Sequence, residues 1–196
     1  MTLSHVVVDG SNIATEGRTK PSLNQLDEAI EAFAAEHPQA DITVIVDATF
    51  GQRISSKESD DYEARVLDGS IVAPPAGVVG RGDAFILQVA DKANASVFSN
   101  DSFQEFHGEH TWLFDKDRLW GGKPVTGVGW VFVARTPVRG SVSRRAVKEA
   151  KTDSKSTPPS KRDAAPAKRG AAPAPKKTPT KRSGSSGGDK PKVGDS

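Results

Sequence analysis

The 196-residue chain contains no cysteine. This absence excludes disulfide bonds, zinc sites built from thiolates and catalysis by a cysteine nucleophile. No stretch approaches the roughly 18 to 20 apolar residues that a membrane-spanning helix needs. The first strand-like segment begins within a few residues of Met1, which leaves no room for a signal peptide. We therefore expect a protein that does not bind membranes and acts in the cytoplasm.

Residues 141–196 have no aromatic residue and no apolar periodicity, and consist mainly of Pro, Ala, Lys, Ser and Gly. Such a composition cannot bury enough apolar surface to offset an ordering cost of about 1–2 kcal/mol per residue. We expect a folded domain over residues 1–140 and a disordered basic tail over 141–196, with at most a transient helix at 141–152.

Charge is distributed unevenly between these two parts. Residues 141–196 hold 15 Lys and Arg against 5 Asp and Glu, a net charge of +10. Residues 1–140 hold 12 against 20, a net charge of −8, so the overall value of +2 conceals an acidic domain with a basic extension. This asymmetry indicates a polyanionic partner for the tail.

Within residues 1–140, short apolar strands alternate with helical segments. Strands are predicted at 5–8, 42–46, 70–75 and 96–99, with further candidates at 111–114 and 129–134. Helices are predicted at 23–37 (after a cap formed by Ser22 and Gln25), 55–69, 82–95 and, as a short segment, 102–107. Repetition of strand, helix and strand is typical of an α/β protein with a central, mainly parallel sheet.

Carboxylates stand where the predicted strands end. Asp9 ends the first strand, Asp47 the second, and Asp101 follows the fourth, while Asp83 opens the helix that comes after the third strand. The carboxyl ends of parallel strands share one edge of the sheet, so these side chains are expected to converge. Like charges held together repel, and a hard divalent cation such as Mg²⁺ or Mn²⁺ would relieve that repulsion.

Each aspartate also has an ordinary explanation, because Asp is common at helix N-caps and after strands. The recurrence of carboxylates at successive strand ends is what favours a site. His107 and His110 lie three residues apart, but no third ligand of their kind accompanies them, and we expect both on the surface.

Three segments, "VVVDGSN", "GRGDAFILQVA" and "SNDSFQEF", resemble in order and spacing the acidic motifs of NYN ribonuclease domains. These domains belong to the PIN-like nucleases, and the likeness is to the Regnase-type subgroup over about residues 4–135. The resemblance implies a PIN-like, Rossmann-like three-layer fold and a metal-dependent endoribonuclease that acts on RNA.

By position, the resemblance implies that the catalytic residues are Asp9, Asn12, Asp83, Asp101 and Glu105. Asp9, Asp83 and Asp101 would hold Mg²⁺ or Mn²⁺, and Asp47 joins them as a predicted ligand because it ends the second strand. Ser11, Arg81 and Asn100 are the predicted substrate contacts, and the basic tail is expected to recruit RNA.

One departure from the family pattern keeps other functions open. The Regnase-type second motif usually has two adjacent aspartates, whereas here Gly82 precedes Asp83. This favours the alternative of a catalytically inactive RNA-binding protein on the same fold. A phosphohydrolase for small phosphoesters is a weaker alternative, because Ser11 occupies the place of its second acid. The oligomeric state is open, and a homodimer is compatible with the sequence.

Overall fold

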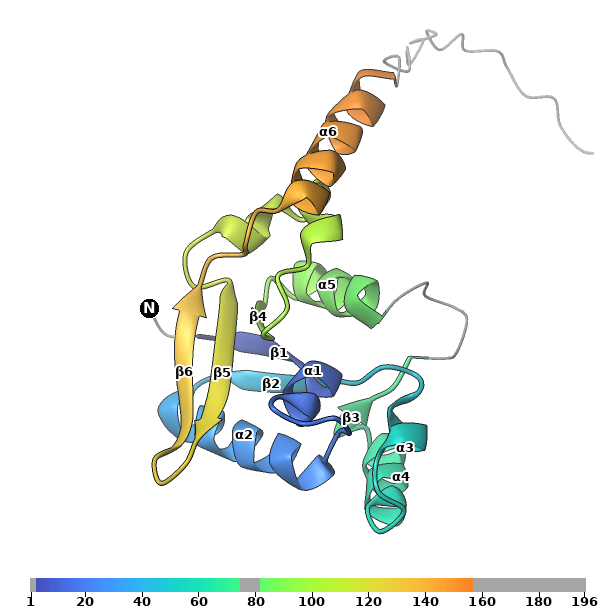
Figure 1. Ribbon diagram of the computed structural model, residues 1–196, viewed down its shortest axis with the longest axis vertical. Coiled ribbons are helices and arrows are strands. Elements are labelled where there is room, and N and C mark those ends of the chain that lie inside the picture. Colours follow the sequence, from blue (N-terminus) through green and yellow to red (C-terminus); the bar gives the residue numbers. More distant parts are fainter. Residues whose placement is uncertain (1–2, 75–81, 157–196) are drawn as a thin grey trace, which may run out of the picture. The chain divides into compact units, whose positions relative to one another are not determined.

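The structure is a computed structural model that describes residues 3–74 and 82–156 (Figure 1). Six strands in this part of the chain form one sheet, in the order β3-β2-β1-β4-β5-β6. They are β1 (His5–Asp9), β2 (Asp41–Ile45), β3 (Ile71–Val72), β4 (Ser96–Phe98), β5 (Leu119–Val125) and β6 (Gly129–Arg135).

Strands β1 to β5 pair in parallel, and only β6 runs antiparallel to its neighbour β5. The chain builds the sheet outward from β1, first toward β3 and then, after crossing back, from β4 toward β6. The strand order therefore reverses between β1 and β4. In open parallel sheets, ligands bind at such a point, outside the carboxyl ends of the strands.

The helices of the described residues are α1 (Gly10–Thr15), α2 (Leu23–Glu36), α3 (Phe50–Arg53), α4 (Ser59–Asp68), α5 (Gly82–Lys92) and α6 (Ser141–Ser156). Two 3-10 helices, η1 (Gln104–Phe106) and η2 (Thr111–Phe114), precede β5. The expected cap of α2 is present, since the Ser22 side chain accepts a hydrogen bond from the Gln25 amide. No helix among these is long and apolar enough to cross a membrane.

Side chains that alternate along the strands pack into two separate hydrophobic cores, one on each face of the sheet. Val6 and Val8 of β1 pack with α2 residues such as Phe33, whereas Val7 between them packs with α5 residues such as Leu87. All of these side chains are buried. The period of two along the strand thus places one helical layer on each face of the sheet (Figure 1). The predicted α/β three-layer fold with a mainly parallel sheet is confirmed.

Two strand predictions differ from the structure. Residues 111–114 form η2 rather than a strand, and β5 was not expected. The sequence of β5, "LWGGKPV", carries Gly121, Gly122 and Pro124, which usually break strand patterns. Here tertiary packing requires the glycines: a Cβ at Gly121 would lie 2.9 Å from Asn100 Oδ1, and one at Gly122 would lie 2.7 Å from Phe132 Cδ1.

The segment predicted to be a disordered tail begins with an ordered helix, α6. Its Ser143 is buried, and the Ser143 hydroxyl lies 2.6 Å from Nδ1 of His107. The expectation of a surface His107 was wrong, because this ring is fully buried and its Nε2 lies 2.6 Å from the Ser102 carbonyl oxygen. The folded part of the chain thus extends past residue 140. Residues 157–196, for which disorder was predicted, lie outside the described residues.

Candidate active site

A hollow of about 230 Å³ lies at the carboxyl ends of the strands, beside the point where the strand order reverses. We call it the acidic hollow, because all four predicted carboxylates line it. Its lining residues are Asp9, Ser11, Asn12, Asp47, Arg53, Gly82, Asp83, Ile86 and Asp101. The sheet topology therefore brings together residues that are separated by up to 92 positions in the sequence.

Asp9 forms the floor of this site. It is only 4% exposed and is also the N-cap of α1, where its Oδ1 accepts a hydrogen bond from the Asn12 amide at 3.1 Å. Its Oδ2 accepts a hydrogen bond from the Ser99 hydroxyl at 2.8 Å. The ordinary explanation therefore holds for this residue, since one oxygen caps a helix, and the same residue also lines the hollow.

The charge of Asp9 is poorly compensated. Burial, with smaller contributions from the nearby charges of Asp83 and Asp101, raises the pKa of Asp9 to about 7. The hydrogen bonds from Ser99 and Asn12 act in the opposite direction but do not offset burial. These partners are neutral, so the hydrogen bonds of Asp9 bring no positive charge to offset the two like charges.

Asp47 lies in a different environment on the other side of the hollow. Partial burial acts to raise the pKa of Asp47, but hydrogen bonds from Thr49 and Ser11 and the charge of Arg53 bring it below its usual range. Its Oδ1 accepts from the Thr49 amide at 2.8 Å, and its Oδ2 forms an ion pair with Arg53. Both oxygens of Asp47 are therefore engaged within the protein.

Asp101 is held at the end of β4 by a network that includes Ser99. The Asp101 amide donates to the Ser99 hydroxyl at 3.1 Å, and this hydroxyl in turn donates to Asp9. Arg135 of β6 reaches over the same turn, where its guanidinium donates to the carbonyl oxygens of Asn100 at 2.7 Å and Asp101 at 2.9 Å. The antiparallel strand β6 thereby fixes the loop that carries the third acid.

The two asparagines of the motifs join the strand ends to each other. Asn12 Oδ1 accepts a hydrogen bond from the Asn100 amide at 2.9 Å. The Asn100 side chain exchanges two hydrogen bonds with the backbone of Gly122 and donates a third to Glu16. Asn100, a predicted substrate contact, thus uses its side chain to tie α1 and β5 together. Ser11 Oγ similarly accepts from the Asp47 amide at 2.8 Å.

A second hollow, of about 580 Å³, shares Asp83 and Asp101 with the acidic hollow. Glu105 lines this second hollow, together with Val138, which precedes α6, and Val142 in the first turn of α6. The structure therefore places Glu105 beside two of the predicted metal ligands but not in the acidic hollow itself. Arg81, the remaining predicted substrate contact, lies outside the described residues.

Sequence reasoning missed three residues that shape the site. Ser99 links Asp9 to Asp101, Arg135 holds the loop after β4, and Arg53 is a cationic side chain in the lining of the acidic hollow. Ser99 stands directly before "ND" at a strand end, which is a local signal that was available. Arg53 and Arg135 have no such local signal in the sequence, because only the fold brings them to the site.

The donor set of the acidic hollow consists of carboxylate, amide and hydroxyl oxygens, which suit a hard cation. Within residues 3–74 and 82–156, however, no three His, Asp or Glu side chains are arranged so that they could hold a metal ion. Mg²⁺ differs from zinc in this respect, because it keeps several waters and is commonly held by one or two carboxylates and substrate phosphates. The residues therefore fit such an ion without forming a closed cage.

A family model described as the Zc3h12a-like ribonuclease NYN domain matches residues 2–119. Two solved structures of nuclear protein-only RNase P 2 from Arabidopsis thaliana are similar to this chain at 18% identity, with TM-scores of 0.52 and 0.49. Each match covers 70% of this chain, which spans 32% and 30% of those chains respectively, and at this identity the likeness concerns the fold alone. The family match covers more than half of the sequence and agrees with the three acidic motifs. The chain belongs to the Zc3h12a-like ribonuclease NYN domain family.

Proposed function

We propose that this protein is an endoribonuclease that requires Mg²⁺ or Mn²⁺ and hydrolyses RNA phosphodiester bonds at the acidic hollow. One observation carries the proposal. Four carboxylates from four separate parts of the chain line one hollow, and burial together with two of the other charges raises the pKa of the innermost, Asp9, to about 7. The single cation in the described lining, Arg53, is paired with Asp47, and NYN and PIN-like nucleases generally use divalent metals.

In this proposal Asp9, Asp83 and Asp101 hold the cation, with Asp47 as a weaker fourth ligand. When bound, the cation neutralises charge on the phosphoryl group and lowers the pKa of an attacking water. The oxygens of Asp47 already accept hydrogen bonds from Thr49 and Arg53, so a cation would have to compete with these donors. We therefore assign Asp47 the smallest share of metal affinity.

The position of Asp47 is relevant to the departure from the family pattern, in which Gly82 stands where a second aspartate is usual. A Cβ built on Gly82 would lie 3.4 Å from the Cβ of Asp47. The side chain of an acid at position 82 would therefore branch from the backbone next to the side chain of Asp47. This proximity favours the hypothesis that Asp47 supplies the charge that the second motif lacks.

The other predicted catalytic residues act on the substrate. The amide Nδ2 of Asn12 makes no hydrogen bond to the described residues and lines the acidic hollow, so it can donate to a phosphate oxygen. Glu105, beside Asp83 and Asp101, is assigned as the general base for the attacking water. Ser11 and Asn100 position Asp47 and the β4 loop, and Asn100 acts on substrate only through that loop.

The net charge of +10 in residues 141–196 supports a role for that segment in RNA recruitment. The domain of residues 1–140 carries −8 and repels phosphate, so a tethered basic segment would raise the local concentration of RNA. We include the tail in the proposed function as a recruiting arm that does not take part in the chemistry.

The proposal is tested by incubating the full chain with single-stranded RNA in Mn²⁺, in Mg²⁺ and in a chelator. We expect internal cleavage in either metal and none in the chelator. Asp9→Asn should abolish this cleavage, and Asp91→Asn, an exposed carboxylate in the last turn of α5, is the matched control that should retain it. Cleavage that survives in Asp9→Asn would contradict the assigned site.

The alternative of an inactive RNA-binding protein rests on two observations. The second motif has one acid instead of two, and no group of three carboxylates within the described part of the chain forms a ready metal cage. RNA binding without cleavage in every metal tested, by a protein whose fold is intact, would favour this alternative.

A further inference from the structure

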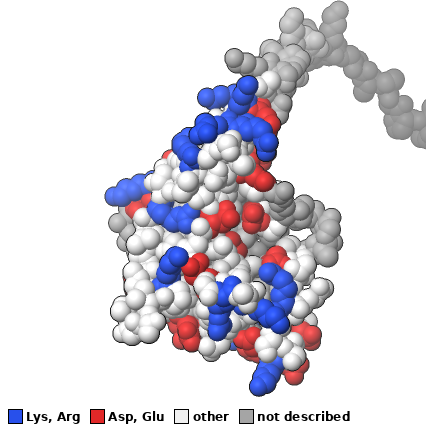
Figure 2. All heavy atoms as spheres, viewed as in Figure 1, with Lys and Arg blue, Asp and Glu red and all other residues white. Residues whose placement is uncertain are grey.

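A third depression lies on the same edge of the domain as the acidic hollow, and its charged lining residues are mainly cations rather than carboxylates. It measures about 840 Å³ and is lined by the segments 18–22 and 54–58; we call it the basic groove. Three of its lining residues, Arg18, Lys20 and Lys57, are cations with exposed side chains. On the face shown in Figure 2, Lys and Arg side chains gather in the region of α1 and α3, close to acidic groups.

These three cations have no acidic partner among the residues that the structure describes. The side chains of Arg18, Lys20 and Lys57 make no ion pair or hydrogen bond with any described residue. Other cations of the domain differ in this respect, because Lys123 pairs with Glu16 at 3.1 Å and Arg65 pairs with Asp61 at 2.8 Å. Unpaired cations that line one depression form a site for polyanions.

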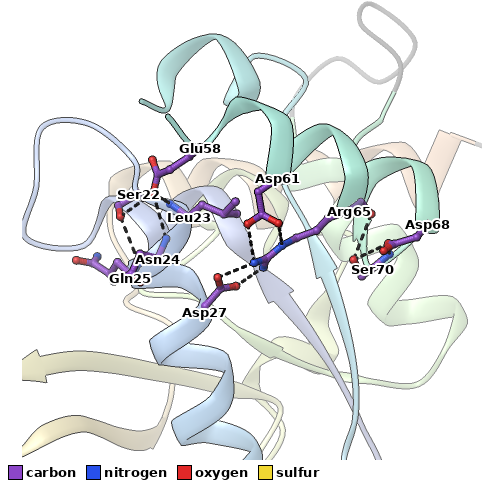
Figure 3. Close-up of polar contacts among 10 residues, drawn as sticks. All are labelled: Ser22, Leu23, Asn24, Gln25, Asp27, Glu58, Asp61, Arg65, Asp68 and Ser70. Carbon is purple, nitrogen blue, oxygen red and sulfur yellow. Dashed lines mark hydrogen bonds and ion pairs between the residues drawn. The ribbon is translucent and has the colours of Figure 1, made fainter. Parts of the chain in front are cut away.

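The carboxylate in the lining of the groove, Glu58, is occupied elsewhere. Its Oε1 accepts hydrogen bonds from the Ser22 hydroxyl and from the Leu23 and Asn24 amides, at 3.3, 2.9 and 3.2 Å, as Figure 3 shows. Glu58 thus caps the N-terminus of α2, where the helix dipole stabilises a negative charge. The carboxylate of Glu58 therefore interacts with the helix N-terminus and does not pair with the three cations of the groove.

The groove and the acidic hollow share no lining residue, but the chain connects them directly. Segment 18–22 connects α1, which begins at Asp9, to α2, and segment 54–58 follows α3, whose last residue Arg53 lines the acidic hollow. Ile54, the next residue, lines the groove. Both segments follow strands β1 and β2 at their carboxyl ends, so the groove and the hollow share one edge of the sheet.

We infer that the basic groove binds the phosphodiester backbone of the RNA strand that flanks the bond held in the acidic hollow. The inference rests on the proposed function. A strand that enters a hollow lined by four carboxylates needs cations beside that hollow, and Arg18, Lys20 and Lys57 supply them. The groove lining contains no aromatic side chain on which bases could stack, so the contact is with phosphates and is independent of base sequence.

The experiment compares two double variants of the full chain that lose the same charge. Lys20→Gln with Lys57→Gln removes two cations of the groove. Lys92→Gln with Lys116→Gln is the control, because Lys92 ends α5 and Lys116 precedes β5, so both lie at the opposite edge of the sheet. All four side chains are exposed. Asp9→Asn is present in both proteins, so that RNA is bound without being cut.

Binding of a single-stranded RNA long enough to span both depressions is measured over a range of salt concentrations. Each phosphate contact to a single strand contributes about 0.7 to the slope of log affinity against log salt. The groove variant should therefore lose about 1.4 from this slope and bind about tenfold to thirtyfold more weakly at about 0.1 M salt, relative to the control. Equal slopes and affinities in the two double variants would overturn the inference.

The outcome for the groove is separate from the outcome for catalysis. With Asp9 restored, the groove variant should cut the long RNA with a raised KM and an unchanged kcat, and a short RNA that fills only the acidic hollow should be cut as by the control. If the protein with Asp9 cuts no RNA but the groove variant loses its salt slope, the proposed function fails and the groove stands. If RNA is cut and the slopes are equal, only the groove inference fails.

Discussion

Asp9 and Asp47 follow neighbouring parallel strands and line the same hollow, yet their environments are opposite. Asp9 is 4% exposed, its hydrogen-bond partners are neutral, and burial raises its pKa to about 7. The side chain of Asp47 is 29% exposed, and despite partial burial its hydrogen bonds and the Arg53 guanidinium lower its pKa. Strand β1 lies between β2 and β4 in the middle of the sheet, whereas the outer neighbour of β2 is the two-residue strand β3, so the end of β1 is the more deeply covered.

The two aspartates lie at the same edge of the sheet, but their different environments give them different expected roles in metal binding. A carboxylate that already has a cationic partner gains little from a metal ion, whereas a buried carboxylate among like charges gains much from one when it is ionised. We therefore expect the side of the hollow formed by β1 and β4 to control metal binding. The side formed by β2 and α3 should change the metal affinity only to a smaller extent.

The largest effect is expected for Asp9→Asn. The amide keeps the shape of the side chain, its oxygen can still accept from the Asn12 amide, and its nitrogen can donate to the Ser99 hydroxyl. The fold should therefore persist, while cleavage should fall by about three orders of magnitude, an effect typical of the loss of a group that stabilises the transition state. RNA cleavage rates and a thermal melt of the same sample measure both quantities.

Asp83→Asn and Asp101→Asn should cause comparable losses, and a double variant should lose little more than each single one, because residues that serve one metal act as a unit. If the effects of two such substitutions multiply instead, the carboxylates do not share one ion.

Next in size is the effect of pH on stability in the absence of divalent cations. The pKa of Asp9 is raised in the folded protein, so its contribution to stability is fully present below the ordinary pKa of 3.8 and is lost as pH rises through about 7. The loss is at most about 4 kcal/mol, since one pKa unit corresponds to about 1.4 kcal/mol. Urea unfolding in a chelator should show lower stability at about pH 8 than at about pH 5 for this reason.

Two comparisons isolate Asp9 in that measurement. Asp9→Asn should flatten the part of the pH dependence between these two values, and added Mg²⁺ or Mn²⁺ should stabilise the wild-type chain more at the higher pH. Identical pH profiles of the wild-type and Asp9→Asn proteins would show that Asp9 is not the group that titrates.

The contact between His107 and Ser143 should contribute a smaller amount. Ser143→Ala leaves Nδ1 of a fully buried ring without its partner, which costs about 1–3 kcal/mol. Ser141→Ala, two residues earlier and exposed, is the control and should change stability little. Urea unfolding distinguishes them, and equal stability of the two variants would mean that α6 is not held by this contact.

Metal affinity should respond least at Asp47. Asp47→Ala should weaken Mn²⁺ binding about tenfold, in line with the loss of one supporting contact. Arg53→Gln removes the competing cation and should strengthen Mn²⁺ binding or leave it unchanged. Titration calorimetry on the two variants decides the matter. A loss after Asp47→Ala as large as that after Asp9→Asn would break the distinction between the two sides of the hollow.

The sequence predicted those features that depend on local signals. Asp9, Asp47 and Asp101 could be placed at strand ends, and Asp83 in the first turn of a helix, because each lies directly beside the pattern that defines its element. The parallel order of the strands then implied their convergence. This part of the site needed no knowledge of distant contacts.

What could not be predicted depends on contacts between distant residues. The strand β5 contains Gly121 and Gly122 because Asn100 and Phe132 leave no room for side chains there. The burial of His107 depends on Ser143, thirty-six positions later, and a chain that ends near Arg139 would expose it. Arg53 meets Asp47 through the turn after β2, in a segment with a weak helical pattern.

The smallest effect on the chemical step is expected from removal of residues 157–196. A chain that ends at residue 156 keeps α6 and every described residue of the site, so its kcat on saturating RNA should equal that of the full chain. The removed segment contains most of the basic residues of the tail and no aromatic residue, so it can displace counterions but cannot stack on bases. The shortened chain should therefore bind RNA more weakly, with a smaller salt slope, and show no change in cleavage sequence. If both chains bind RNA equally well at low salt, the tail is not a recruiting arm, and the basic groove and α6 must supply the electrostatic attraction.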